Sequence, residues 1–285
     1  MRDFARFAHD ARESFREPQP APVAIVTSQA AQFSAIRELQ ITAQRNSARA
    51  AAYGTNTPVY IIAENQIAKL GAPKLAILPS AQSLEESTWQ TLLAYVKAGG
   101  NLLVTGPVER DPHWHRVDRA AAIGLDAQLE PLTTHNAEMR VKDQSIHFSF
   151  DANAQSWLEA LRFKDGQQLK EIPYGSGRVF WAPYPVELAE GAEAAVALYS
   201  AVFAEIGIQP LFELKSPAVR GLLIYPTILQ DSVLYVMVSE ADEDTDVDLT
   251  DKTSGAELKL HLPAQHAAMA VIRKSDGAIA AKYGF

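Results

Sequence analysis

Residues 75–107, LAILPSAQSLEESTWQTLLAYVKAGGNLLVTGP, decide the fold of this chain. The stretch begins with a short apolar run at 75–78 and ends with another at 102–105, and each run is typical of a strand buried on both faces. Between them, apolar side chains recur every three or four residues, which predicts a buried helical face made of Leu84, Trp89, Leu92, Leu93 and Val96. A strand, a helix and a second strand in this order predict one unit of a parallel sheet.

The predicted helix carries signals at both of its ends. Ser83 and Glu86 have the spacing of a capping box, so we expect the helix to begin at Ser83. Gly99 and Gly100 are expected to end it.

The alternation of strands and helices continues on both sides of this unit. Further buried strands are expected at 23–26, 59–62 and 178–182, and helices at about 32–53 and 191–206. Residues 108–170 are less regular, with strand signals near 137–150 and a short helix expected near 154–162. The pattern predicts an α/β domain whose parallel sheet has helices on both faces.

The pattern changes after Gly207. Short strands without intervening helices are expected at 222–229, 233–239, 258–262 and 268–272, which predicts a small antiparallel β-sandwich. At the other end, residues 2–16 fit an amphipathic helix with three phenylalanines, which either packs on this chain's own core or belongs to the end of something larger. We therefore expect three parts: a helix and proline-rich linker at 1–20, the α/β domain at 21–207 and the β-sandwich at 208–285.

Composition excludes several classes of function. The 285 residues include 26 Lys and Arg against 34 Asp and Glu, a net charge of −8, which argues against a nucleic-acid partner. Cysteine is absent, which excludes disulfides, thiolate metal sites and a cysteine nucleophile, and is compatible with either side of a membrane. No apolar run reaches the roughly 18 residues of a membrane span, and the N-terminus does not resemble a signal peptide. No membrane partner is expected, and a cytoplasmic location is favoured.

The usual nucleotide and hydrolase motifs are missing. The first strand is followed by Thr27-Ser28-Gln29-Ala30, without the glycines that let the backbone approach a pyrophosphate. Neither a GxxxxGK[ST] loop nor a GxSxG elbow occurs, and Gly175 and Gly177 are best explained as a hairpin turn. We expect no cofactor.

A dense polar cluster follows the strand at 102–105, at the kind of loop where parallel sheets bind ligands. Its members are Glu109, Arg110, Asp111, Pro112, His113, Trp114 and His115. Asp111 with the two histidines could ligate a metal, but a metal site needs three or four convergent ligands and a second shell, so no metal is expected. A sugar or partner contact and a purely structural loop both remain open, and the structural loop is favoured.

Two further groups of acids have an ordinary explanation. The run of aspartates at 242, 244, 246 and 248 fails as a calcium loop, because Val247 stands where glycine is needed and Thr253 where glutamate is needed; a solvated hairpin loop fits better. Glu64, Glu109 and Glu187 lie near predicted strand ends and could converge for glycoside cleavage. Capping helices and solvating loops are the favoured roles for these three, since the chain lacks the eightfold repeat of a barrel.

Four stretches of the α/β domain resemble a known family: residues 23–28, 74–80 (KLAILPS), 99–107 (GGNLLVTGP) and 181–187 (WAPYPVE). They are similar to the class I glutamine-amidotransferase-like middle domain of the β-galactosidases of glycoside hydrolase family 42 and their relatives. In that family a TIM barrel hydrolyses the sugar, the middle domain builds the trimer and a small β domain follows. The resemblance implies a flavodoxin-like, amidotransferase-like sheet, self-association as a trimer, and a catalytic barrel in the same polypeptide.

The amidotransferase chemistry is missing from these stretches. Active enzymes carry a nucleophilic cysteine in the turn after the strand that aligns with 102–105, where this chain has Thr-Gly-Pro at 105–107. Their His-Pro-Glu-like segment aligns with Tyr-Pro-Val-Glu at 184–187, so Tyr184 replaces the base. The hydroxyl of Thr105 would need an adjacent base, and none is evident, so acyl transfer is not expected.

The resemblance thus implies a non-catalytic oligomerisation and scaffold region of a β-galactosidase-like glycoside hydrolase. The alternative is a stand-alone sugar-binding or sensor module that holds its ligand over Ser28, Ser80 and the 109–115 loop. A third possibility is an unfamiliar enzyme that uses His113 and His115. The candidate ligand or partner contacts are Ser28, Glu64, Ser80, Glu109, Arg110, Asp111, His113, Trp114, His115, Tyr184 and Glu187.

Overall fold

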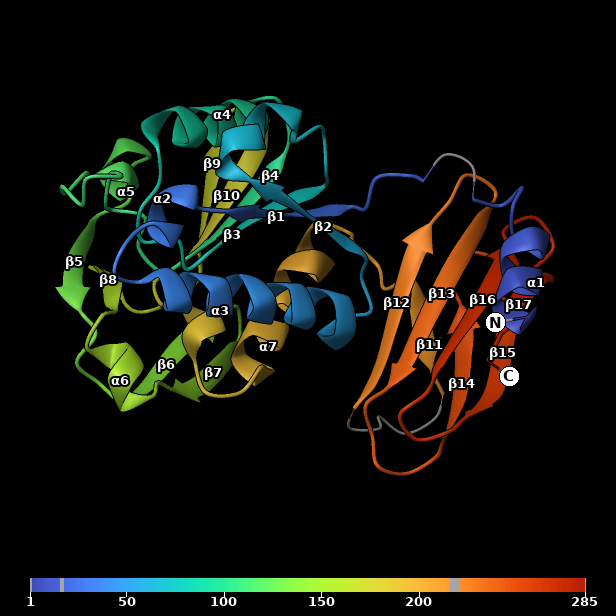
Figure 1. The fold of residues 1–285 in the computed structure, drawn as a ribbon. Helices are drawn as coiled ribbons and strands as arrows, with labels where there is room; N and C mark the ends of the chain where they lie inside the picture. Colours follow the sequence, from blue (N-terminus) through green and yellow to red (C-terminus); the bar gives the residue numbers. More distant parts are fainter. Residues whose placement is uncertain (1, 16–17, 216–220, 285) are drawn as a thin grey trace. The chain divides into compact units, whose positions relative to one another are not determined.

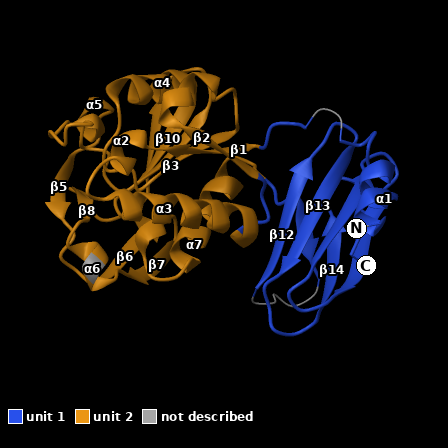
Figure 2. Ribbon diagram, in the orientation of Figure 1, with its two compact units in different colours: residues 1–21, 55–58, 209–285 blue, residues 22–54, 59–208 orange. Residues whose placement is uncertain are grey.

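The computed structural model describes residues 2–15, 18–215 and 221–284. The chain divides into two units, which Figure 2 shows in different colours. Unit 1 consists of residues 1–21, 55–58 and 209–285, and unit 2 of residues 22–54 and 59–208.

Unit 2 is built on a six-stranded sheet with the order β2-β1-β3-β4-β10-β9 (Figure 1). Its strands are β1 (Val23–Thr27), β2 (Val59–Ala63), β3 (Leu75–Pro79), β4 (Asn101–Thr105), β9 (Lys170–Tyr174) and β10 (Gly177–Ala182). All neighbours are parallel except the edge strand β9, which forms a hairpin with β10. The five parallel strands follow the flavodoxin-like order, so the predicted α/β class is confirmed.

Helices cover both faces of this sheet. Helix α4 (Glu86–Lys97) packs on β4 and β10, whereas α3 (Arg37–Arg49) packs on β1 and β3 from the opposite face, on which α7 (Glu193–Glu205) also lies (Figure 1). The predicted apolar face of α4 is buried, with Trp89 in contact with Trp181 of β10 at 5.7 Å between ring centroids. Because successive strand side chains point to opposite faces, Leu102 and Val104 join the α4 core while Leu103 is buried on the other side.

Three local predictions were wrong. The helix expected at 32–53 is divided into α2 (Gln29–Gln32), α3 and a π-helical segment, Ala50–Gly54. The helix expected at 154–162 is only α6 (Ala152–Gln155), followed by strand β8 (Glu159–Phe163), in which Leu161 and Phe163 are buried and the intervening residue is exposed. That period of two belongs to a strand, and β8 pairs with β5 (Ala127–Pro131). The strand signals near 137–150 are confirmed as the hairpin of β6 (Asn136–Val141) and β7 (Gln144–Ser149).

The third wrong prediction is the capping box. Helix α4 begins at Glu86, with Glu85 at the N-cap and no side chain of its own capping it. The hydroxyl of Ser83 instead donates to the carbonyl oxygen of Asp111 at 2.8 Å. Ser83 and Glu86 have the spacing of a capping box, but the hydroxyl of Ser83 binds the loop after β4 and does not cap α4.

Unit 1 contains two antiparallel sheets packed as a β-sandwich, which confirms the antiparallel C-terminal part of the predicted fold class. One sheet contains β11 (Phe212–Leu214), β14 (Thr245–Asp251) and β15 (Glu257–Leu262). The other contains β12 (Leu222–Ile228), β13 (Ser232–Ser239), β16 (Ala267–Arg273) and β17 (Ile279–Tyr283). The two sheets share one core, to which Leu249, Leu260, Tyr235 and Ile272 contribute. The aspartates at 246 and 248 lie in β14 rather than in a solvated loop, because Val247 and Leu249 alternate with them into this core.

The N-terminal helix α1 (Arg2–Asp10) packs on the sandwich. Phe7 is 2% exposed and lies in an apolar cluster with Val271 and Ala281, and its ring centroid is 6.4 Å from that of Tyr283. Of the two interpretations of this helix, packing on the chain's own core is the one observed. No helix in the described part of the chain is long and apolar enough to cross a membrane.

The remaining short elements of unit 2 lie at or near the carboxyl ends of its parallel strands. They are the 3₁₀ helix η2 (Glu64–Lys69), helix α5 (Arg119–Ala122) and the 3₁₀ helix η3 (Val186–Leu188).

Candidate functional site

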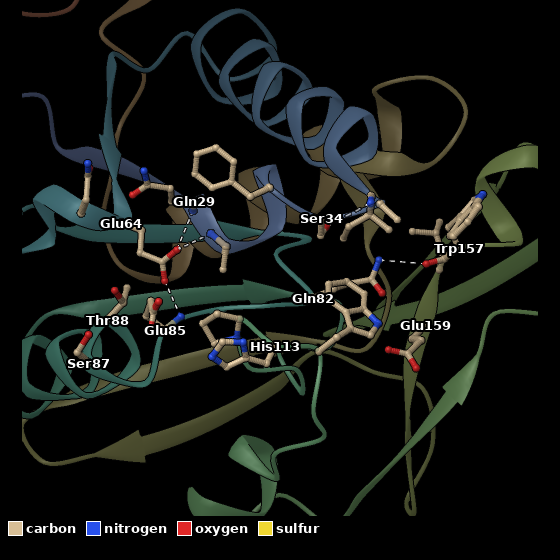
Figure 3. A pocket seen from close by; sticks show the side chains of 18 of the residues that line it. Gln29, Ser34, Glu64, Gln82, Glu85, Ser87, Thr88, His113, Trp157 and Glu159 are labelled. Carbon is tan, nitrogen blue, oxygen red and sulfur yellow. Dashed lines mark hydrogen bonds between the residues drawn. The ribbon is translucent and has the colours of Figure 1, made fainter.

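A cavity of about 920 Å³ lies where strands β1 to β4 end, within unit 2 (Figure 3). Ligands of open α/β sheets bind in this region, beside the point where the strand order reverses. The cavity is lined by Gln29, Ala30, Phe33, Ser34, Ala35, Ile36, Glu64, Asn65, Gln82, Glu85, Ser87, Thr88, Pro112, His113, Trp114, Pro131, Ser156, Trp157, Leu158 and Glu159.

Glu64, at the end of β2, caps two helices. Its Oε2 accepts hydrogen bonds from the backbone N–H groups of Gln29 and Ala30 at 2.7 and 3.1 Å, in the first turn of α2. Its Oε1 accepts the N–H of Glu85 at 2.6 Å, at the N-cap of α4 (Figure 3). Helix N-termini attract anions because their N–H groups are unpaired and their dipoles are positive there. In this protein a buried carboxylate of the chain itself occupies that position.

Glu109 has the same role after β4. Its two carboxylate oxygens accept the N–H groups of Arg119 and Ala120, both at 2.9 Å, at the start of α5. Burial raises the pKa of Glu109, although the two N–H donors oppose that shift. The guanidinium of Arg119 donates in turn to the carbonyl oxygens of Val108 and Leu84, at 2.7 and 2.8 Å. This network fixes the loop after β4 against the segment before α4.

Glu187, after β10, is bound by three hydroxyl groups. Ser80 and Thr105 donate to its Oε2 at 2.7 and 2.6 Å, and Tyr199 of α7 donates to its Oε1 at 2.6 Å. Burial raises the pKa of Glu187 above its usual range. Thr105 therefore does have an adjacent carboxylate, contrary to the sequence-based expectation. Both groups are enclosed, at 0% and 1% exposure, so the pair has no access to a substrate.

The 110–115 loop is held by its own side chains. Asp111 accepts the N–H groups of His113 and His115 at 2.9 and 2.8 Å and contacts Nδ1 of His115 at 3.2 Å. Arg110 forms a bidentate ion pair with Glu159 of β8, in which Nε and Nη2 each donate to one carboxylate oxygen. In the part of the chain that the structure describes, no three His, Asp or Glu side chains are grouped closely enough to hold a metal ion.

The two remaining candidates are structural in their contacts. Ser28 caps α2, because its hydroxyl oxygen accepts a hydrogen bond from the N–H of Ala31 at 3.0 Å. The same hydroxyl donates a hydrogen bond to the carbonyl oxygen of Ser83 at 2.6 Å. Tyr184, in the slot of the amidotransferase base, is half-buried and packs edge-on against Phe148 at 5.5 Å.

Three of the predicted contact residues line the cavity: Glu64, His113 and Trp114. The others are Ser28, Ser80, Glu109, Arg110, Asp111, His115, Tyr184 and Glu187, and they lie outside its lining. Sequence reasoning missed Phe33, Gln82 and Trp157. The one signal for these residues in the sequence was that Phe33 and Trp157 are aromatic and stand in segments with weak hydrophobic periodicity.

Comparison with known proteins gives a structural likeness only. No family model and no curated protein matches the sequence. Among solved structures, a β-galactosidase from Bacillus circulans sp. alkalophilus matches with a TM-score of 0.67 at 12% identity, over 93% of this chain and 43% of that one. A β-galactosidase from Rahnella sp. R3 matches with a TM-score of 0.62 at 15% identity, over 89% and 41%.

A catalytic mutant of a glycoside hydrolase family 42 β-galactosidase from G. stearothermophilus matches with a TM-score of 0.62 at 14% identity, over 90% of this chain and 41% of that one. This chain therefore spans about two fifths of the length of the β-galactosidases that it matches. The order of a flavodoxin-like α/β unit and an antiparallel sandwich agrees with the resemblance seen in the sequence. The chain thus has the fold of a non-barrel portion of family 42 β-galactosidases.

Proposed function

We propose that this chain is a non-catalytic oligomerisation and scaffold region of a β-galactosidase-like glycoside hydrolase. The observation that carries the proposal is the structural match of about 90% of this chain to about 40% of such enzymes. A fold by itself does not establish an activity, so the chemistry of the site has to agree with this role.

The carboxylates support a role without catalysis. Glycoside cleavage needs two carboxyl groups that face each other across an open cleft. Both carboxylate oxygens of Glu64 and of Glu109 accept backbone N–H groups, and both oxygens of Glu187 accept hydroxyl groups. These side chains hold loops and helices at the sheet edge, as a scaffold requires, and none of them faces another across the cavity.

Two measurements on the purified chain test the proposal. With nitrophenyl β-galactoside as substrate, we expect no release of nitrophenol above background. A turnover of about 10 s⁻¹, an ordinary enzymatic rate, would refute the non-catalytic role. Sedimentation velocity over a concentration series should show self-association, with a trimer of the 31.1 kDa chain as the largest closed species. A monomer at every concentration would refute the oligomerisation role.

A further inference from the structure

Aromatic side chains are exposed around the cavity of unit 2. Phe33 is 83% exposed, Trp157 57% and Trp114 37%, and all three line the same cavity. Large aromatic residues are normally buried, because each removes a large apolar area from water. They come from three separate segments of the chain, so their convergence on one cavity requires an explanation other than core packing.

Gln82 offers an unused hydrogen-bonding group at the same cavity. Its side chain is 1% exposed and its Nε2 donates to the carbonyl oxygen of Trp157 at 3.4 Å (Figure 3). Its Oε1 has no hydrogen-bond partner among the described residues. Flipping the side-chain amide would not give Oε1 a donor, since Oε1 would then face the carbonyl oxygen of Trp157, which is also an acceptor. Buried acceptors without partners are rare in native proteins, and a ligand donor would satisfy this one.

The backbone at the cavity is held in an unusual conformation. Gln82 and Trp114 have φ angles of +32° and +68°, in a region that side-chain-bearing residues seldom adopt. Such strain costs free energy and is concentrated at binding and catalytic sites, where it aims particular side chains. Here it places the unsatisfied amide and one of the aromatic rings at a single cavity.

The lining indicates the chemistry of the ligand. It contains no lysine or arginine, so an anionic ligand would find no counter-charge. Two of its carboxylates are already engaged, Glu64 by N–H groups and Glu159 by Arg110. Besides the exposed carboxylate of Glu85 and the imidazole of His113, what remains is a set of aromatic faces, amides and hydroxyls, namely Phe33, Trp114, Trp157, Gln29, Asn65, Gln82, Ser34, Ser87 and Thr88.

We propose that this cavity is a non-catalytic binding site for a neutral oligosaccharide. A sugar ring has apolar C–H faces that stack on aromatic side chains, and its rim of hydroxyl groups both donates and accepts hydrogen bonds. A sugar hydroxyl would donate to Oε1 of Gln82 while the ring lies against Trp157. The volume of about 920 Å³ is at the upper end of the range for small-ligand sites, which suits more than one sugar ring.

The test is calorimetric titration of the full 285-residue chain with lactose, cellobiose and maltose, with adenosine and glucuronate as counter-probes. We expect saturable binding of at least one disaccharide with a Kd of about 1 mM or tighter. Trp157→Ala should weaken that binding at least about tenfold, because the stacking face is lost. Tyr53→Ala is the matched control, since Tyr53 is 36% exposed and does not line the cavity. Circular dichroism verifies that both variants fold.

Several outcomes would overturn the inference: no disaccharide saturates the chain, adenosine or glucuronate binds instead, or Trp157→Ala and Phe33→Ala both leave disaccharide binding unchanged. The result is separable from the oligomerisation role. A trimer that binds no sugar defeats this inference alone, and a monomer that binds sugar defeats only the oligomeric assignment.

Discussion

Replacing Glu64 with alanine should destabilise unit 2 by about 4 kcal/mol. The carboxylate is 4% exposed and accepts three backbone N–H groups, so its loss leaves two helix N-termini without their acceptor. Hydrogen bonds to charged groups contribute about 1.5 kcal/mol each at the lower end of their range. For a unit of this size the loss corresponds to a fall in Tm of roughly 8–16 °C.

Urea denaturation followed by tryptophan emission is the appropriate assay. All four tryptophans lie in unit 2, so their emission reports its unfolding separately from that of the sandwich. Glu64→Gln should lose less than Glu64→Ala, since its amide oxygen can still accept the two N–H groups of α2. Glu38→Ala, an exposed position in the first turn of α3, is the control and should change stability by no more than about 0.5 kcal/mol. If Glu64→Ala costs less than about 1 kcal/mol, the double-cap argument is wrong.

Three further perturbations test other parts of the structure. Because burial raises the pKa of Glu187, its ionisation opposes folding, so stability falls as pH rises from the ordinary glutamate value of about 4.3 through the raised value. Burial also raises the pKa of Glu109, so the Glu187→Gln variant should show a smaller fall than the unmodified protein. Parallel pH profiles of the two proteins in urea would contradict the assignment. Arg119→Ala should cost about 3 kcal/mol in tryptophan-detected unfolding, because it strips buried carbonyl oxygens of their donor; a change within about 0.5 kcal/mol would show that the network does not hold the loop. Phe7→Ala should cost about 3–4 kcal/mol in a transition seen by far-ultraviolet circular dichroism but not by tryptophan emission, whereas an unchanged transition would mean that α1 does not stabilise the sandwich.

The three buried glutamates occupy positions that could otherwise bind ligands in this architecture. In a doubly wound sheet, helix N-termini at the carboxyl edge are natural anion sites. Glu64 and Glu109 fill such positions from within the chain, and Glu187 is enclosed by hydroxyls. The sheet edge is thereby closed to phosphate at those points, and the aromatic cavity lies at the same edge, with Glu64 in its lining.

The sequence was sufficient to predict most strands of the parallel sheet and the antiparallel strands near 222–229, 233–239, 258–262 and 268–272. It did not predict β8 or β14, which were expected as a helix and a loop. The predicted strands follow from local hydrophobic periodicity, because the apolar residues of a buried strand or helix face recur along the sequence with the period of that element. The apolar runs at 23–26, 75–78 and 102–105 became β1, β3 and β4. Of the predicted apolar face of α4, Trp89, Leu92, Leu93 and Val96 are buried in the helix, whereas Leu84 is buried just before it. The favoured interpretation of the glutamates, helix capping and loop solvation, holds for the caps of Glu64 and Glu109, whereas Glu187 is buried among hydroxyls.

The site, in contrast, depends on how distant segments pack. Glu64 caps α4 from 21 residues away, a role that the local Ser83 and Glu86 spacing assigned to the wrong residue. The cavity joins Phe33, Gln82 and Trp157, which share no sequence pattern and come from the segments after β1, after β3 and before β8. The sequence pattern around a residue indicates the helix or strand to which it belongs. Its partners depend on how distant elements pack, and that information resides in the whole fold.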